Sequence, residues 1–152
     1  MSLSLPIVDN RINTILGTRN VVSNQYPAPT GTTSTSGVMM GLALYFTPKF
    51  TGRIRMYIFG LAANDTAGDG FTVHGQYGTG TAPANGAPLT GNLLGNIVQG
   101  TAINGGQYTP FAIGAIQTNL AVGTTYWFDL VVAAVTGGTA SISFIIAIVE
   151  EF

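Results

Sequence analysis

Short runs of β-branched and aromatic residues recur along the sequence, and clusters of Gly, Pro, Asn and Asp separate them. Val, Ile, Thr and aromatic residues favour extended strands, whereas Lys and Glu, which favour helices, are scarce. Short strands divided by turn residues are typical of a sandwich or jelly roll. We therefore predict an all-β fold, an antiparallel two-sheet β-sandwich or jelly roll with seven to nine strands. The expected strands are Val38–Phe46, Arg53–Ala62, Phe71–Tyr77, Leu93–Gln99, Tyr108–Ile116, Thr125–Val135 and Ala140–Val149.

The first 37 residues differ from the rest of the chain. Pro27–Gly37 is rich in Pro, Thr and Ser, a composition typical of a linker. We predict an N-terminal arm and linker over residues 1–37 and a jelly-roll domain over residues 38–152. The arm carries apolar residues beside arginines, and such a segment gains order by docking onto a partner. It is a candidate anchor, with Leu5, Ile7, Arg11, Ile15 and Arg19 as its contact residues. The alternative is that this segment supplies another strand of the same sandwich.

Charged residues make up only 7% of the chain, against roughly 25% in ordinary soluble domains. With five basic and six acidic residues the net charge is −1, so no basic stripe is available for nucleic acid. Asp129 and the turn at residues 136–139 interrupt the most apolar stretch, which is therefore too short to span a membrane as a helix. We expect neither nucleic acid nor membrane as a partner, and a surface largely covered by other protein subunits.

Two of the expected strands are apolar on both faces. A two-layer sandwich buries only one face of each sheet, so the second face of Thr125–Val135 and of Ala140–Val149 needs a cover. We expect that cover to be another copy of the chain, most simply in a homotrimer. The candidate interface residues on these strands are Trp127, Val131 and Ile145.

A charged pair is predicted at the same interface. Arg53 and Arg55 share one strand face, and Asp129 lies on an otherwise apolar face. Because a buried charge needs a partner, we consider an arginine–Asp129 contact across subunits. The alternative is that both arginines are exposed and keep the sheet surface soluble.

No catalytic constellation is recognisable. The chain has one histidine, His74, and no cysteine, so neither a zinc site nor thiol catalysis has its usual residues. Asn64–Gly70 is rich in oxygen ligands, but it lacks the spacing of a calcium loop and is better interpreted as a turn. We expect no enzyme activity and no cofactor.

The segment Leu120–Tyr126, with the pattern Leu-x-x-Gly-Thr-x-Tyr, resembles the tyrosine corner of β-sandwich domains such as fibronectin type III. In that motif the tyrosine hydroxyl bonds to the backbone just upstream. The motif supports a sandwich fold and carries no functional information.

Over roughly residues 32–149, the sequence resembles a module of small tailed-bacteriophage virion proteins. The segments that carry the resemblance are Phe46–Arg53, Asn64–Gly70, Tyr77–Gly91, Gly123–Asp129 and Val135–Ala140. The resemblance implies a trimeric jelly-roll unit located on the virion, as a capsid decoration protein, a head fibre or a fibre tip. It implies no catalytic residues.

The sequence is compatible with two functions of the protein. The first is a structural protein that decorates and stabilises a phage capsid, with itself and the major capsid protein or another virion protein as partners. The alternative is a receptor- or glycan-binding tip of a phage fibre. Exposed aromatic residues in loops would favour the alternative, and the Gly78–Gly91 loop has none.

Overall fold

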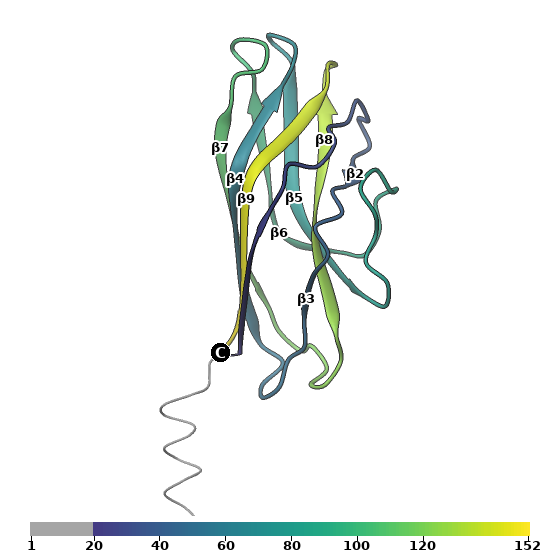
Figure 1. Ribbon diagram of the computed structural model, residues 1–152, viewed down its shortest axis with the longest axis vertical. Coiled ribbons are helices and arrows are strands. Elements are labelled where there is room, and N and C mark those ends of the chain that lie inside the picture. Colours follow the sequence, from purple (N-terminus) through teal and green to yellow (C-terminus); the bar gives the residue numbers. More distant parts are fainter. Residues whose placement is uncertain (1–19) are drawn as a thin grey trace, which may run out of the picture.

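The computed structural model describes residues 20–152, which form a two-layer antiparallel β-sandwich without helix (Figure 1). The all-β prediction is confirmed, and the strand count within residues 20–152 is nine. The strands are β1 (Val21–Tyr26), β2 (Val38–Met39), β3 (Leu44–Phe46), β4 (Ile54–Asn64), β5 (Gly70–Thr79), β6 (Asn92–Thr101), β7 (Thr109–Gln117), β8 (Tyr126–Val135) and β9 (Ala140–Glu151).

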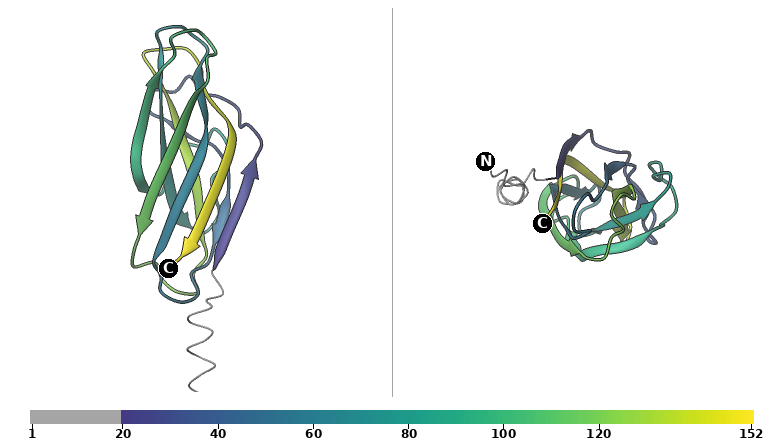
Figure 2. Two further views of the ribbon diagram at one scale, coloured as in Figure 1. Left: turned by 90° about the vertical axis from the view of Figure 1, so that its left-hand side faces the viewer. Right: turned by 90° about the horizontal axis from the view of Figure 1, so that it is seen from below.

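The strands divide into two sheets that face each other. One has the order β1-β9-β4-β7, and the other has the order β2-β8-β5-β6, with β3 also paired to β8. Turned by 90°, the molecule shows the first sheet face-on, with β1 at one edge and β7 beside β6 at the other (Figure 2). Every paired neighbour is antiparallel, as expected for strands joined by short turns.

The segment after residue 19 bears on whether the N-terminal region is an arm and linker or another strand of the sandwich. Val21–Tyr26 pairs with β9 along its whole length, so this part of the chain supplies an edge strand of the sandwich. Residues 1–19, which include the five anchor candidates Leu5, Ile7, Arg11, Ile15 and Arg19, lie outside the described residues.

The core lies between the sheets and follows the period-2 alternation of the sequence. In β4, Ile54, Met56 and Ile58 are buried, while the intervening residues are more exposed. Other large side chains of this core, each almost fully buried, include Phe46, Phe71, Phe128, Met40, Leu94, Ile113, Leu130 and Ile142.

A smaller cluster covers the opposite face of β8. Trp127 and Val131 pack there against Met39, and Ala82 and Ala87 of the β5–β6 loop close the cluster. The indole nitrogen of Trp127 donates to the carbonyl of Thr79 at 3.1 Å. The second apolar face of β8 is therefore covered by the same chain, which corrects the expectation that another copy covers it.

The C-terminal end of β9 is fixed by an unusual carboxylate site. The Glu151 side chain accepts hydrogen bonds from four consecutive backbone N–H groups, Lys49–Gly52, at 2.5 to 3.0 Å. The amide of Asn20 donates to the same carboxylate at 3.0 Å and to the carbonyl of Thr47 at 2.8 Å. The beginning of β1, the β3–β4 loop and the end of β9 are thereby joined.

Local motifs behave as their sequences predict. The backbone N–H of Ala121 donates to the Tyr126 hydroxyl at 2.9 Å, which confirms the tyrosine corner. Gly137 and Gly138 lie in the tight turn between β8 and β9. Gly138 has a φ of +65°, and a Cβ there would lie 2.1 Å from Asn64 Oδ1, so only glycine fits.

Candidate interaction surface

A β-bulge in β9 determines which side chains the β1-β9-β4-β7 sheet exposes. Phe59 pairs with Ile146 and Leu61 pairs with Ser143, so two residues of β9, Phe144 and Ile145, lie opposite the single residue Gly60. Phe144 has a φ of +52°, a left-handed conformation that is unfavourable for a bulky residue. The bulge turns Phe144 outward and Ile145 into the core.

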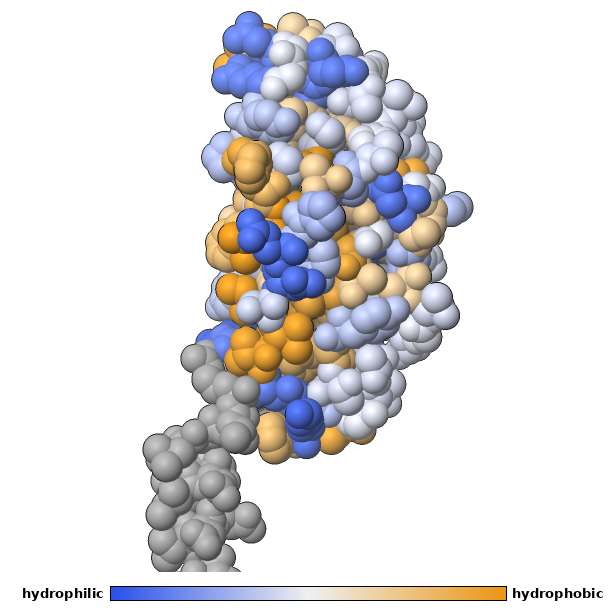
Figure 3. All heavy atoms as spheres, in the orientation of Figure 1, coloured by the Kyte–Doolittle hydropathy of each residue, from blue (hydrophilic) through white to orange (hydrophobic). Residues whose placement is uncertain are grey.

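The outward-facing side of this sheet, here called the outer face, is largely apolar. Five large side chains are substantially exposed on it: Phe144 (69%), Ile116 (67%), Phe59 (45%), Ile146 (43%) and Tyr57 (40%). Strand register makes them neighbours, since Phe59 pairs with Ile146 and Tyr57 pairs with Ile148 of the same face. In the space-filling view, hydrophobic residues gather on the side where β7, β4 and β9 lie (Figure 3).

The apolar area of the outer face is large for a monomer. At about 200 Å² for a fully exposed large side chain, the five residues offer on the order of 500 Å² of apolar surface. Patches of this size on a small protein commonly mark an interaction site. A standard interface buries about 800 Å² per partner, so the outer face supplies much of what one contact needs.

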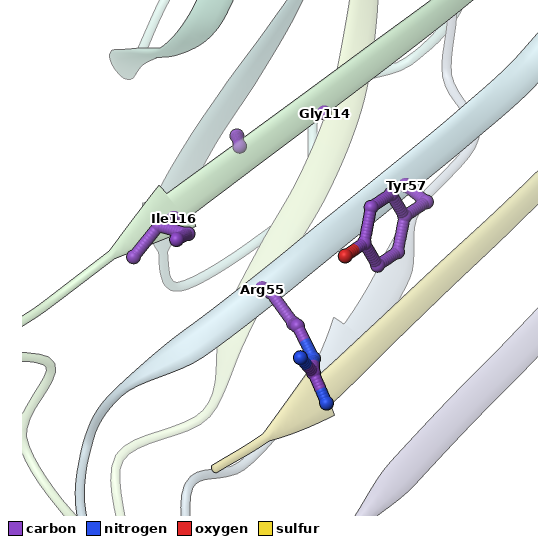
Figure 4. A pocket seen from close by; sticks show the side chains of 5 residues that line it. Arg55, Tyr57, Gly114 and Ile116 are labelled. Atoms are coloured by element: carbon purple, nitrogen blue, oxygen red, sulfur yellow. The ribbon is translucent and has the colours of Figure 1, made fainter.

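A shallow hollow interrupts the outer face over Gly114. It has a volume of about 400 Å³ and is lined by Arg55, Tyr57, Gly114, Ala115 and Ile116. Figure 4 shows Tyr57 on β4 and Ile116 on β7 beside the backbone at Gly114, with Arg55 extending towards β9. Tyr57 and Gly114 are register partners, and the missing side chain of Gly114 leaves the space open.

Charges border the outer face at the end that carries the C-terminus. Arg55 forms an ion pair with Glu150, its register partner on β9. The guanidinium groups of Arg53 and Arg55 lie over the Phe152 ring, at 4.8 Å and 5.5 Å from its centroid. Both arginines thus have contacts within their own chain.

The other predicted interface residues are buried. Trp127 and Ile145 are at most 4% exposed, and Val131 and Asp129 are fully buried. The Asp129 carboxylate accepts hydrogen bonds from the backbone N–H groups of Gly41 and Leu42, each at 2.9 Å. Because one chain already encloses these four side chains, they are not available to a second copy in the folded protein.

Burial perturbs the pKa of Asp129. Desolvation raises the pKa to about 6, against the opposing effect of the backbone hydrogen bonds from Leu42, Leu130 and Gly41. The carboxylate holds the segment between β2 and β3, where Gly41 and Ala43 both have positive φ. Its role is thus the positioning of a backbone segment, where an intersubunit charge pair was expected.

Phe144, Ile146 and Ile116 were not among the interface residues expected from the sequence. Plain alternation placed Ile142, Phe144 and Ile146 on one face of β9, but the bulge separates Ile142 from the other two. The available signal was Gly60, because a glycine inside a strand often marks a bulge or a close backbone approach. A Cβ on Gly60 would lie 2.7 Å from the Phe111 ring.

The histidine and the acidic turn singled out in the sequence do not form a metal site in the described part of the chain. Residues 20–152 contain no group of three or more His, Cys, Asp or Glu side chains that could hold a metal ion. His74 is half-buried on β5, and burial lowers its pKa. In the Asn64–Gly70 turn, Asn64 Oδ1 and Asp65 Oδ1 accept hydrogen bonds from Thr66 and Thr139. No helix of residues 20–152 is long and apolar enough to cross a membrane.

The fold is one found in viral capsids. No family model and no curated protein matches the sequence. A structure of infectious bursal disease virus, Gx strain, is similar with a TM-score of 0.53 and 8% identity, over 88% of this chain and 32% of that chain. A crystal structure of an infectious bursal disease virus particle gives a TM-score of 0.54 and 10% identity, over 86% and 31%.

A third similar structure, a mutant VP2 protein of the same virus in derived particles, has a TM-score of 0.52 and 11% identity, over 88% and 32%. The chain spans about a third of the length of each of these three proteins. At such low identity the likeness shows a shared fold, a β-sandwich of the kind used by a viral capsid protein, and nothing more specific.

Proposed function

We propose that the protein is a structural virion component, which decorates and stabilises a bacteriophage capsid by packing against copies of itself, most simply as a trimer. The observation that carries the proposal is the apolar outer face on a sandwich with a capsid-type fold. A chain with 7% charged residues and such a face is better suited to a close-packed assembly than to life as a free monomer.

Two further features support an inert structural role. Extensive hydrogen bonding of loops and of the last strand, as at Glu151 and the tyrosine corner, favours a durable fold over a mobile one. The resemblance of residues 32–149 to phage virion modules also points to the capsid or a fibre. We propose no enzymatic activity and no cofactor for the protein.

The test is the composition of purified virions. Particles are isolated from a culture that produces the protein, and its copy number relative to the major capsid protein is measured by quantitative mass spectrometry. The proposal expects copies in a fixed, high ratio to the capsid protein, and lower heat resistance of particles from a deletion strain. Absence from particles, with all of the protein in the soluble fraction, would contradict it.

One observation favours the alternative of a receptor- or glycan-binding fibre tip. Phe50, in the loop between β3 and β4, is 61% exposed, and an exposed loop aromatic can stack on a sugar. Copy number discriminates the two functions. A fibre tip is present in a few copies at the tail, and Phe50→Ala would then reduce adsorption to the host without affecting capsid stability.

A further inference from the structure

We propose that neighbouring copies of this chain contact each other through the outer face, with Phe144 of one copy seated in the hollow over Gly114 of the next. The proposal specifies the contact used by the self-assembly proposed above. A protein could occupy a virion without this contact, so the two proposals fail separately.

Phe144 has the geometry of a contact residue. It is 69% exposed, and it adopts a left-handed backbone conformation that costs free energy in a bulky residue. Within one chain this conformation places a phenyl ring in water, with no compensating burial. Bulges often re-aim a side chain at functional sites, and a bulge beside Gly60 does so here.

The hollow has the matching character. Its walls are the ring of Tyr57 and the side chain of Ile116, and its floor is the backbone of Gly114. Arg55, at its rim, already pairs with Glu150, so the hollow presents no unpaired charge that an aromatic ring would desolvate. A flat, apolar phenyl ring is the type of side chain that such a hollow accepts.

One chain cannot fill its own hollow. Phe144 lies opposite Gly60, three residues along β4 from Tyr57, and β9 and β7 are separated by β4. At about 3.3 Å per residue and 4.8 Å between strands, the backbones of Phe144 and Gly114 are on the order of 14 Å apart. The ring and the hollow thus meet only between two molecules.

A second copy suits the outer face better than a partner of different chemistry. At its border Arg55 is paired with Glu150 and Arg53 lies over the Phe152 ring, so little there selects a strongly acidic or basic partner. The exposed apolar area, on the order of 500 Å², approaches the standard 800 Å² per partner once flanking residues such as Ile148 and Ala112 are included. The projection on β9 and the recess between β4 and β7 are different patches, so each copy can insert Phe144 into the next around a closed ring, as a trimer needs.

The absence of cysteine makes the contact directly measurable. The double variant Gln25→Cys/Ala112→Cys keeps Phe144 and Ile116 and places an exposed thiol on each side of the outer face. It is treated with a short bis-maleimide and analysed on a denaturing gel. Gln25 and Ala112 lie in one row of the sheet, three strands apart, so about 14 Å separates their backbones. A bis-maleimide with a shorter span cannot join them within one chain. The matched control is Leu93→Cys/Ile97→Cys, two residues 54% and 55% exposed on β6, away from the outer face.

The proposal expects covalent dimers and larger multimers from the outer-face variant and little from the control. It also expects Phe144→Gly, which relieves the backbone conformation, to remain folded by circular dichroism but to sediment as a monomer where the unmodified chain is oligomeric. A monomeric unmodified chain, equal cross-linking in both variants, or an oligomer that Phe144→Gly leaves intact would each overturn it. Dissociation on removal of residues 1–19, with no outer-face cross-links, would instead assign the assembly contact to that segment.

Discussion

Replacing Glu151 with glutamine should destabilise the fold in a pH-dependent way. The carboxylate accepts hydrogen bonds from the backbone N–H groups of Lys49–Gly52 and from Asn20. Although desolvation opposes them, these bonds lower its pKa from 4.5 to about 2. In Glu151→Gln an amide N–H₂ replaces one acceptor oxygen and faces donors, so part of the network is lost.

The magnitude follows from the pKa difference. A shift of this size corresponds to at most about 3 kcal/mol of stability. Because glutamine keeps one acceptor oxygen and with it part of the network, we expect Glu151→Gln to lower the free energy of unfolding by about 2 kcal/mol at pH 7. A folded pKa below the unfolded value stabilises the fold above about pH 4.5, and the stabilisation is lost as the pH falls towards 2.

The assay is urea unfolding of both proteins at pH 7, 4 and 2.5, with Glu150→Gln as the matched control. Glu150 is similarly buried, but its ion-pair partner Arg55 has a side chain that is 39% exposed, so we expect Glu150→Gln to cost less than Glu151→Gln. The difference between unmodified chain and Glu151→Gln should shrink as the pH falls. A difference that is constant with pH, or no larger than that of Glu150→Gln, would refute the reasoning.

Three other substitutions test the account. The pKa of Asp129 is raised from 3.8 to about 6, so the fold loses up to about 3 kcal/mol of stability as the pH rises from about 4 to 6 and the carboxyl ionises. Asp129→Asn should remove this decrease in urea unfolding curves, and an unchanged pH profile would contradict the prediction. Tyr126→Phe removes the hydroxyl of the tyrosine corner and should cost about 1 kcal/mol, measured by chemical denaturation, with the oligomeric state unaffected. Gly138→Ala should lower the melting temperature much more than Gly80→Ala. Both glycines have positive φ, but only the Cβ at position 138 clashes, at 2.1 Å from Asn64 Oδ1. Equal decreases in melting temperature would argue against steric exclusion.

The strand pattern was predictable because it depends on local chemistry. Runs of β-branched residues between turn clusters located β4 to β9 closely, and the face of β4 that carries Ile54, Met56 and Ile58 was the buried one. Val38–Phe46 was expected as one strand, but it is divided into β2 and β3. The division occurs where the Asp129 carboxylate accepts hydrogen bonds from the backbone N–H groups of Gly41 and Leu42, which are 88 and 87 residues away from it in sequence.

The interaction surface was less predictable because it depends on long-range packing. An apolar strand face indicates that something covers it, but alternation does not say what. For Trp127 and Val131 the cover is Met39 and the β5–β6 loop of the same chain. For β9 a one-residue bulge exchanged the roles of Ile145 and Phe144, since a shift of one residue moves every later side chain to the other face.

The most direct test of a structural role in the virion is an electron-microscopic reconstruction of the intact particle. The account predicts density for many copies of the sandwich on the capsid surface, with the outer faces of neighbouring copies towards each other and Phe144 against Gly114 of the next copy. A particle without this density, or copies whose β1-β9-β4-β7 sheets face solvent, would contradict it.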